Sequence, residues 1–287
     1  MAGFGALALG AERRVYRDSR SAGVVYALSL VATAAGAGAL LDRLAPGRGG
    51  RTVGTALVTW TVLGGTTLRR EATGLATRLE AGELAAARWR LSHLCGRDPA
   101  DLDAAELARA TVESVAENTS DAVVGPLVWA ALAGLPGMLA YRAVNTLDAM
   151  VGHRSERYER FGWAAARLDD GANLLPARLT AALTVLLAPV VGGGPAGTLR
   201  VWRRDGGKHP SPNAGPVEAA FAGALGRTLG GRLAYAGRVE ERPLLGNGPA
   251  PAVSDIARAT RLSAAVQATA GALCLGWFCL AAWWERP

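Results

Sequence analysis

The sequence is short of lysine and cysteine, and both absences narrow what the chain can be. Lys208 is the only lysine among the 31 basic residues, so the net charge of +7 is carried by arginines scattered along the chain. Scattered positive charge argues against nucleic-acid binding and fits a membrane protein with basic loops. The three cysteines, Cys95, Cys274 and Cys279, form no CxxC pair, which argues against a disulfide framework or a zinc site.

Two common catalytic patterns are also missing. No Ser-His-Asp arrangement stands out among the three histidines, and the phosphate-binding spacing GxxxxGK[ST] is absent. His93 lies on a mixed helical segment without an evident partner, so we expect a structural role for it. His153 and His209 each lie in a polar cluster, where either can act as a general acid or base or contact phosphate.

Long uncharged stretches are what the sequence does contain, in a chain that is 50% hydrophobic. Crossing a bilayer takes about 20 apolar residues. Stretches near that length predict an all-α, polytopic integral membrane protein, multi-pass in the cell membrane, with 1–287 as one domain and amphipathic helices forming a polar site. The predicted spans are 22–41, 52–68, 122–140, 179–199 and 262–284. The polar segments between them are 69–121, 141–178 and 200–261.

Proline and glycine interrupt two of these spans. If all five crossed, the distribution of arginine would place the N-terminus in the cytoplasm and would put 141–178 on the far side from the acids of 69–121. Irregular backbone at membrane depth is tolerated where it is buried or lines a cavity. We therefore expect 122–140, 179–199 or both to be re-entrant or sharply kinked.

The first polar cluster is "ESVAENTSDAVVGP", residues 113–126, which runs into an apolar stretch. Glu113, Glu117 and Asp121 are four residues apart, so an α-helix places them on one face. Such acids repel one another unless a cation neutralises them, and Mg²⁺ binds carboxylates together with substrate phosphates. A solvated helix face is the alternative, and the spacing leaves both open.

The second cluster is "YRAVNTLDAMVGHRSERYERFG", residues 141–162. Arg142, Asn145 and Asp148 lie within two turns of a helix that we expect Gly152 to end. A helix end with a glycine cap explains Gly152 but not Asn145 or Asp148 beside a membrane. Hydrogen bonding between helices is the alternative use of these polar groups.

Two further clusters follow. In "RLDDGANLLPARLT", residues 167–180, Asp169 and its neighbour Asp170 can bind a metal, cap the next helix or pair with Arg178. In "RRDGGKHPSPNAGPVEAAFAGALG", residues 203–226, a glycine-rich stretch precedes a helix expected near Pro216. Such backbone can hold phosphate and a lysine can add charge to it, while a plain surface loop is the alternative.

Taken in order, these motifs resemble the CobD/CbiB family of cobalamin biosynthesis, the adenosylcobinamide-phosphate synthases. The resemblance is carried by "ESVAENTSDAVVGPL", by the stretch from "YRAVNTLDAMVGHRSERYERFG" to "PARLTA", and by "DGGKHPSPNAGPVEAAFAGALG…LGG". It spans roughly residues 10–285. Family members usually begin with an apolar segment carrying "GDP…HP", so we expect such a segment to be missing before Met1.

The resemblance implies an integral membrane enzyme that joins aminopropanol, or its O-phosphate, to the free propionate of adenosylcobyric acid, using ATP and Mg²⁺. The expected partners are these substrates, the lipid bilayer and other membrane-bound cobalamin enzymes, with no nucleic acid. Two rival interpretations stay open: a membrane transferase acting on a Mg-diphosphate, and a non-catalytic transporter or scaffold.

On this resemblance we assign hypothetical roles to the clustered residues. His153 is expected to deprotonate the attacking amine, and the catalytic set is Glu117, Asp121, His153 and Lys208. The expected Mg²⁺ ligands are carboxylates: Glu113, Glu117, Asp121, Asp148 and Asp169. Basic groups expected on phosphate are Arg154, Lys208 and His209. The remaining residues expected to bind substrate are Arg142, Asn145, Ser211 and Asn213.

Overall fold

The structure, a computed structural model, describes residues 2–96, 98–153, 155–235 and 238–284. It is 77% helical, and the described strands form one two-stranded sheet. The chain separates into two compact units, which are described one at a time. Unit 1 comprises Met1–Leu63, Gly125–Leu175 and Leu273–Pro287, and unit 2 comprises Gly64–Val124 and Pro176–Ala272.

The helical, multi-pass membrane architecture predicted from the sequence is confirmed. Within the described residues, four helical stretches are long and apolar enough to cross a membrane: Arg20–Leu44, Ala104–Gly152, Leu174–Val191 and Val253–Ala281. The stretch predicted at 52–68 is not one of them. It falls on two helices, because one helix ends at Val62 and the next begins at Gly65.

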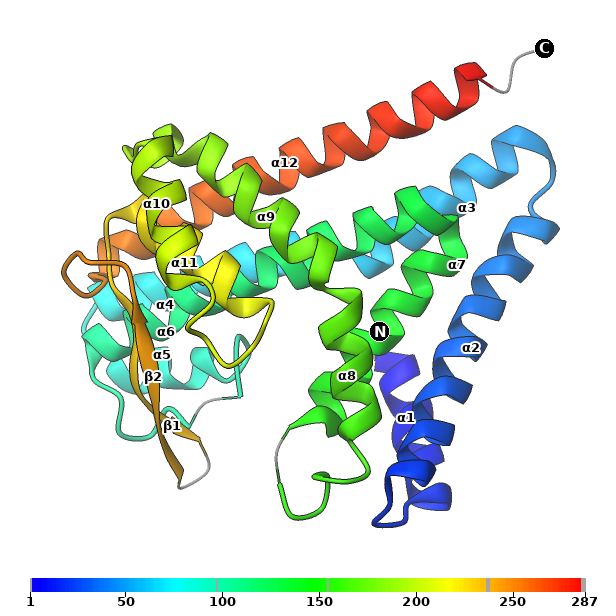
Figure 1. Ribbon diagram of the computed structural model, residues 1–287, viewed down its shortest axis with the longest axis horizontal. Helices are drawn as coiled ribbons and strands as arrows, with labels where there is room; N and C mark the ends of the chain where they lie inside the picture. The colour runs from blue at the N-terminus through cyan, green and yellow to red at the C-terminus, as the bar shows by residue number, and fades with distance from the viewer. Residues whose placement is uncertain (1, 97, 154, 236–237, 285–287) are drawn as a thin grey trace. The chain divides into compact units, whose positions relative to one another are not determined.

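Unit 1 is built around a pair of long helices. α2 runs beside α7 (Figure 1), and α8 packs against both. A buried core that includes Tyr26, Leu147, Val151 and Phe161 joins them. The elements of the unit, besides the end of α12, are α1 (Ala2–Val15), α2 (Arg20–Leu44), α3 (Gly47–Val62), α7 (Gly125–Leu147), the π-helical turn η2 (Asp148–Gly152) and α8 (Trp163–Ala172).

The kink expected within 122–140 is present in α7. Ala133 (φ −141°, ψ 19°) and Gly134 (φ 62°, ψ −152°) leave helical geometry, and Pro136 follows at once. Glycine accepts the positive φ that other residues disfavour. On α2, Gly38 lies against this kink, since a Cβ there would be 2.7 Å from the Pro136 nitrogen. The close approach of α2 to the broken helix therefore depends on a glycine.

Unit 2 contains the two strands and most of α12, the longest described helix. The described elements are α4 (Gly65–Glu80), α5 (Leu84–Leu91), α6 (Ala104–Thr119), the π-helical turn η1 (Ser120–Val124), α9 (Leu174–Leu187), the 3₁₀ turn η3 (Ala188–Val191), α10 (Pro195–Asp205), α11 (Ala214–Leu225), β1 (Leu229–Tyr235), β2 (Arg238–Leu245) and α12 (Val253–Trp284). α9 enters the unit at Pro176, and α12 leaves it after Ala272.

Local sequence signals explain where the helices of unit 2 begin and end. Asp103 and Glu106 form a capping box at the start of α6, with reciprocal bonds of 2.8 and 2.9 Å. After α9, Gly192 takes a left-handed conformation (φ 79°) and ends η3. The predicted span 179–199 is therefore broken before α10 starts at Pro195.

The sequence did not predict the β-hairpin, because 200–261 was expected to be only a polar segment of an all-α protein. β1 and β2 lie side by side (Figure 1) and pair antiparallel. Their register shifts between Leu229 and Gly231. Gly230 (φ 88°) and Gly231 (φ 87°) take the backbone conformation that this bulge requires. The Arg109 guanidinium of α6 donates to the Gly230 carbonyl at 2.7 Å and so fixes the hairpin to α6.

Candidate active site

A cavity of about 480 Å³ opens where α10 turns into α11 in unit 2. Its lining combines basic side chains with proline and glycine and, among the described residues, includes no aspartate or glutamate. The residues that line it are Arg178, Trp202, Arg203, Gly206, Gly207, His209, Pro210, Pro212 and Pro216. A positively charged recess of this size suits a small anionic group such as a phosphate.

Glycine is required at two positions of the turn that forms this cavity. A Cβ on Gly215 would overlap the Gly206 carbonyl oxygen and lie 2.7 Å from the His209 Cβ. A Cβ on Gly206 would lie 2.8 Å from the Trp202 carbonyl oxygen. The turn can therefore pack directly on the first turn of α11, which places His209 in the cavity wall.

Arg178 is fixed at the head of α11. Its Nη1 donates to the Asn213 Oδ1 at 2.8 Å, and Asn213 immediately precedes the helix. The Ser211 hydroxyl accepts from the backbone N–H groups of Asn213 and Ala214, at 3.3 and 3.2 Å. Ser211 and Asn213, both predicted to bind substrate, thus build the turn, and Asn213 also positions a guanidinium that lines the cavity.

Asp205 anchors the other end of this turn. Its buried carboxylate accepts bonds from Arg204 at 2.6 and 2.8 Å, from the Lys208 ammonium at 2.7 Å and from the Gly246 N–H at 2.9 Å. The Arg204 guanidinium, followed by Lys208 and the Gly246 N–H, holds the pKa of Asp205 well below its ordinary value, although burial opposes the shift. Lys208, predicted to contact phosphate, is bonded to Asp205 and is not part of the cavity lining.

The acidic stripe of unit 2 is divided between different environments. Glu113 is buried, and its Oε1 accepts the Gly230 N–H at 2.7 Å, whereas Glu117 is exposed and Asp121 is half-buried. The spacing argument assumed an uninterrupted α-helix, but η1 begins at Ser120 and changes the phase of the residues that follow. The described residues contain no group of three or more His, Cys, Asp or Glu side chains placed to hold a metal ion. The multi-carboxylate metal site expected from the sequence is thus not formed among them.

In unit 1 the structure brings three predicted residues together. The Arg142 Nη1 donates to the Asn145 Oδ1 at 2.9 Å, and the Asn145 Nδ2 donates to the Asp169 Oδ1 at 3.4 Å. Asn173 donates to the other oxygen of Asp169 at 2.9 Å and accepts from the Tyr141 hydroxyl at 2.7 Å. α7 and α8 are thus joined by a continuous polar network, in which Tyr141 and Asn173 were not predicted.

The remaining predicted residues of unit 1 follow this network along the chain. Asp148 lies in η2 and packs over Gly152, where a Cβ would overlap its carboxylate oxygen. His153 is exposed, and its ring meets Tyr158 edge-on at 5.0 Å between centroids. The Tyr158 hydroxyl donates to the buried Glu12 at 2.9 Å, and burial together with this bond raises the pKa of Tyr158. Arg154, predicted to contact phosphate, lies outside the described residues.

Comparison with known proteins gives the family. A model described as "CobD/Cbib protein" matches residues 1–263. The chain belongs to the CobD/CbiB family. A relative named "Cobalamin biosynthesis protein CobD" from Mycobacterium tuberculosis strain H37Rv is 55% identical over 270 residues, covering 94% of this chain and 86% of the relative. One of the same name from Geobacter metallireducens is 46% identical over 241 residues, covering 82% and 74%. No solved structure matches the chain.

Membership of the CobD/CbiB family confirms the resemblance drawn from the motifs. Those motifs supply Arg142, Asn145 and Asp169 to the network of unit 1, and His209 to the cavity of unit 2. Residues that the sequence did not single out, Arg203 and Trp202, line the same cavity. The sequence signal that could have identified them is the basic, amphipathic pattern of α10, which ends at the glycine-rich turn.

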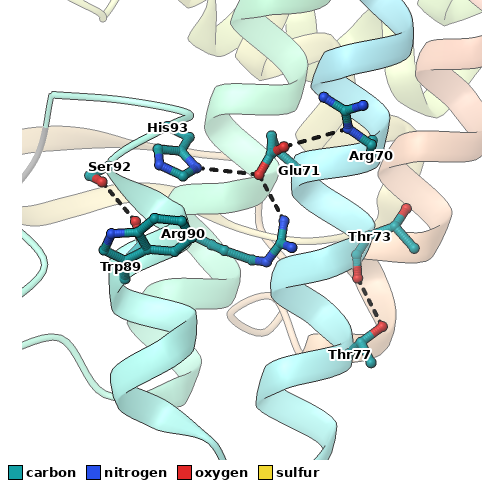
Figure 2. Close-up of polar contacts among 8 residues, drawn as sticks. All are labelled: Arg70, Glu71, Thr73, Thr77, Trp89, Arg90, Ser92 and His93. Carbon is teal, nitrogen blue, oxygen red and sulfur yellow. Dashed lines mark hydrogen bonds and ion pairs between the residues drawn. The ribbon is translucent and has the colours of Figure 1, made fainter.

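His93 has a polar partner, contrary to the expectation from the sequence of this CobD/CbiB chain. Figure 2 shows Glu71 of α4 between His93 and Arg90, with Oε2 at 3.4 Å from His93 and 2.8 Å from Arg90. The Trp89 ring meets the His93 ring edge-on at 4.4 Å between centroids. The cluster joins α4 to α5 and to the residues after it, in keeping with a structural role for His93.

Proposed function

We propose that this protein catalyses ATP-dependent amide-bond formation, joining aminopropanol or its O-phosphate to the propionate carboxylate of adenosylcobyric acid. The product is adenosylcobinamide or its phosphate. Family membership supports the pathway. The basic cavity at the head of α11 supports phosphate chemistry, and it is the structural observation on which the proposal depends.

The cavity fits a phosphate and not a corrinoid. Arg178 and Arg203 supply guanidinium groups, which bind phosphate oxygens in pairs of hydrogen bonds. α11 directs the positive end of its dipole towards the same region. Adenosylcobyric acid, a corrin ring that carries amide side chains and an adenosyl group, is larger than a cavity of about 480 Å³. This recess is therefore proposed to hold the phosphates of ATP or of the aminopropanol donor.

Mg²⁺ fits this chain as a phosphate-bound ion. Mg²⁺ usually keeps several waters and takes one or two protein carboxylates together with substrate phosphates, so a cage of three protein ligands is not required. Glu117 is exposed and Asp121 is half-buried, and both carboxylates are proposed to hold the ion. Glu113 is the weaker candidate because its carboxylate already anchors β1.

Amide formation from a carboxylate requires that one carboxylate oxygen become a leaving group. ATP with Mg²⁺ supplies the phosphoryl group for this activation. The chain's own residues bind and orient the reactants. Arg178 and Arg203 are proposed to hold phosphate, Arg142 and Asn145 to orient substrate, and His153 to accept the proton of the attacking amine.

The direct test is a reconstituted reaction with the full chain in detergent or nanodiscs. Adenosylcobyric acid, Mg-ATP and either aminopropanol or its O-phosphate are incubated, and the amide is sought by mass spectrometry while ATP cleavage is followed. We expect the amide to form with ATP consumed in step. Arg178→Gln removes a cavity charge while leaving a hydrogen-bond donor, so we expect product formation to fall by at least about tenfold.

Each outcome separates the proposal from its rivals. Corrinoid binding without amide formation or ATP cleavage would favour the transporter or scaffold interpretation. Diphosphate release from a prenyl or lipid diphosphate, with no ATP used, would favour the transferase interpretation. Wild-type turnover by Arg178→Gln would remove the cavity from the mechanism.

A further inference from the structure

The hairpin reaches the cavity through Arg242. This residue lies on β2, opposite Gly231 on β1, and its Nη1 is 3.0 Å from the His209 Nε2. His209 lines the cavity and is 8% exposed. Arg242 and His209 are far apart in sequence, so only the folded hairpin makes this contact.

The contact determines which form of His209 is compatible with the structure. A guanidinium has only donor groups, so its contact with the His209 Nε2 is a hydrogen bond only when Nε2 carries no proton. The other ring nitrogen, Nδ1, accepts the Ser211 N–H at 3.0 Å and lies 3.4 Å from the Ser211 carbonyl. A protonated ring would turn an N–H towards a donor at both nitrogens, whereas a neutral ring does so at only one, so the two contacts together favour the neutral ring.

The hairpin is held at its base, so Arg242 is not on a loose element. Gly230 of β1 is bonded to both Arg109 and Glu113 of α6. After β2, the Gly246 N–H donates to Asp205 at the end of α10. The strand that carries Arg242 is thus fixed to the helix that leads into the cavity turn.

We propose that Arg242 is a positioning residue of the cavity, which holds His209 as a neutral ring in one orientation and thereby makes the hairpin part of the site. This proposal relies on the proposed function only for the identity of the ligand in the cavity; the contact between Arg242 and His209 does not depend on it. In this arrangement both nitrogens of His209 are directed at protein groups. His209 then shapes the cavity wall, and the charge that meets an anion comes from Arg178 and Arg203.

The charged groups around His209 favour the neutral ring. Arg178 and Arg203 line the same cavity and repel an imidazolium. The carboxylate of Asp205 is engaged by Arg204 and Lys208. On β2, Glu241 is adjacent to Arg242, and neighbouring strand residues point to opposite faces.

The proposal is tested by NMR on the full chain labelled with ¹⁵N-histidine. The chemical shifts of the His209 ring nitrogens are measured from pH 8 to pH 5.5. The chain has three histidines, so the loss of one signal set in His209→Asn assigns the ring. We expect the wild-type ring to stay neutral down to about pH 5.5. In Arg242→Met we expect it to take up a proton near pH 6.5, the ordinary range for histidine.

A conservative variant separates positioning from folding. Arg242→Lys keeps a positive donor, so we expect its ring to stay neutral as in the wild type. A merely structural role would lower the unfolding temperature of Arg242→Met without moving the pH of proton uptake. Proton uptake by the wild-type ring at the same pH as in Arg242→Met would overturn the proposal. This result does not depend on whether the amide product forms, so the two proposals can fail separately.

Discussion

Replacing Asp205 by asparagine perturbs the group that joins α10, the cavity turn and the hairpin. The carboxylate accepts from Arg204, Lys208 and the Gly246 N–H. Asparagine keeps one acceptor oxygen and turns an NH₂ group, itself a donor, towards these donors. Because Gly246 directly follows β2, we expect the base of the hairpin to open first.

The size of the effect follows from how exposed each partner is. The side chains of Arg204 and Lys208 are about half exposed (47% and 49%), so their ion pairs contribute little. The Gly246 N–H loses the carboxylate that accepts its bond, which costs about 1–3 kcal/mol. At 1.36 kcal/mol for each factor of ten, protection of the hairpin amides should fall by about 5- to 150-fold.

Hydrogen exchange with mass spectrometry measures this directly, in peptides covering β1 and β2 compared with peptides from α1 and α2. Asp18→Asn is the matched control, because Asp18 forms an exposed pair with Arg160 at 3.9 Å and should change stability by less than about 0.5 kcal/mol. Unchanged protection of the hairpin in Asp205→Asn would refute the reasoning.

The same comparison has a pH dependence with a defined sign. The folded-state pKa of Asp205 is depressed, so its stabilising contribution is fully present above the ordinary aspartate pKa of about 3.9 and is lost as the pH falls below it towards the depressed value. After correction for intrinsic exchange rates, the difference between wild type and Asp205→Asn should be constant from pH 8 to about pH 5. It should shrink below about pH 4.

Three further substitutions test other parts of the structure. Gly215→Ala, whose Cβ would overlap a backbone oxygen of the cavity turn, should lower product formation by at least about tenfold, whereas Gly197→Ala on α10, with nothing within 4 Å and outside the cavity lining, should be near wild type. Gly38→Ala places a Cβ 2.7 Å from backbone at the α7 kink and should lower the free energy of unfolding by about 1–3 kcal/mol, while Gly36→Ala should not. Glu117→Gln, at an exposed position, should keep the fold but lose most Mg-ATP-dependent turnover; near-normal turnover would remove Glu117 from metal binding.

Features that depend on a few neighbouring residues could be predicted from the sequence. The end of the second polar helix at Gly152 and the break in 122–140 were both predicted from nearby glycine and proline, although Gly152 does not take the left-handed conformation of a glycine cap. The kink was predicted from the proline and glycine residues within 122–140, and it is centred on Ala133 and Gly134 because glycine accepts a positive φ.

Features held by distant contacts could not be predicted in this way. The hairpin contains Gly230, Gly231 and Pro243, residues that weaken a strand prediction. Its base is stabilised by Glu113 and Asp205, which lie far from it in sequence. The bond between Glu113 and the Gly230 N–H could not be predicted either, because it depends on a strand that the sequence did not reveal.

Two of the candidate acids, Asp121 and Asp148, lie in π-helical turns of the described residues, whereas Glu113 lies in a regular α-helix. A π turn is rare within helices and is frequently found at functional sites. In η1 the widened turn leaves the Ala122 carbonyl to accept the Gly64 N–H at 3.0 Å, so the irregularity is stabilised from outside the helix. In η2 the side chain of Asp148 lies over Gly152, and a Cβ at Gly152 would displace the carboxylate of Asp148. η1 begins one residue before Asp121, and η2 begins at Asp148. Each turn thus places a predicted acid on irregular backbone, whereas Glu113 lies on a regular turn of α6 and accepts the Gly230 N–H.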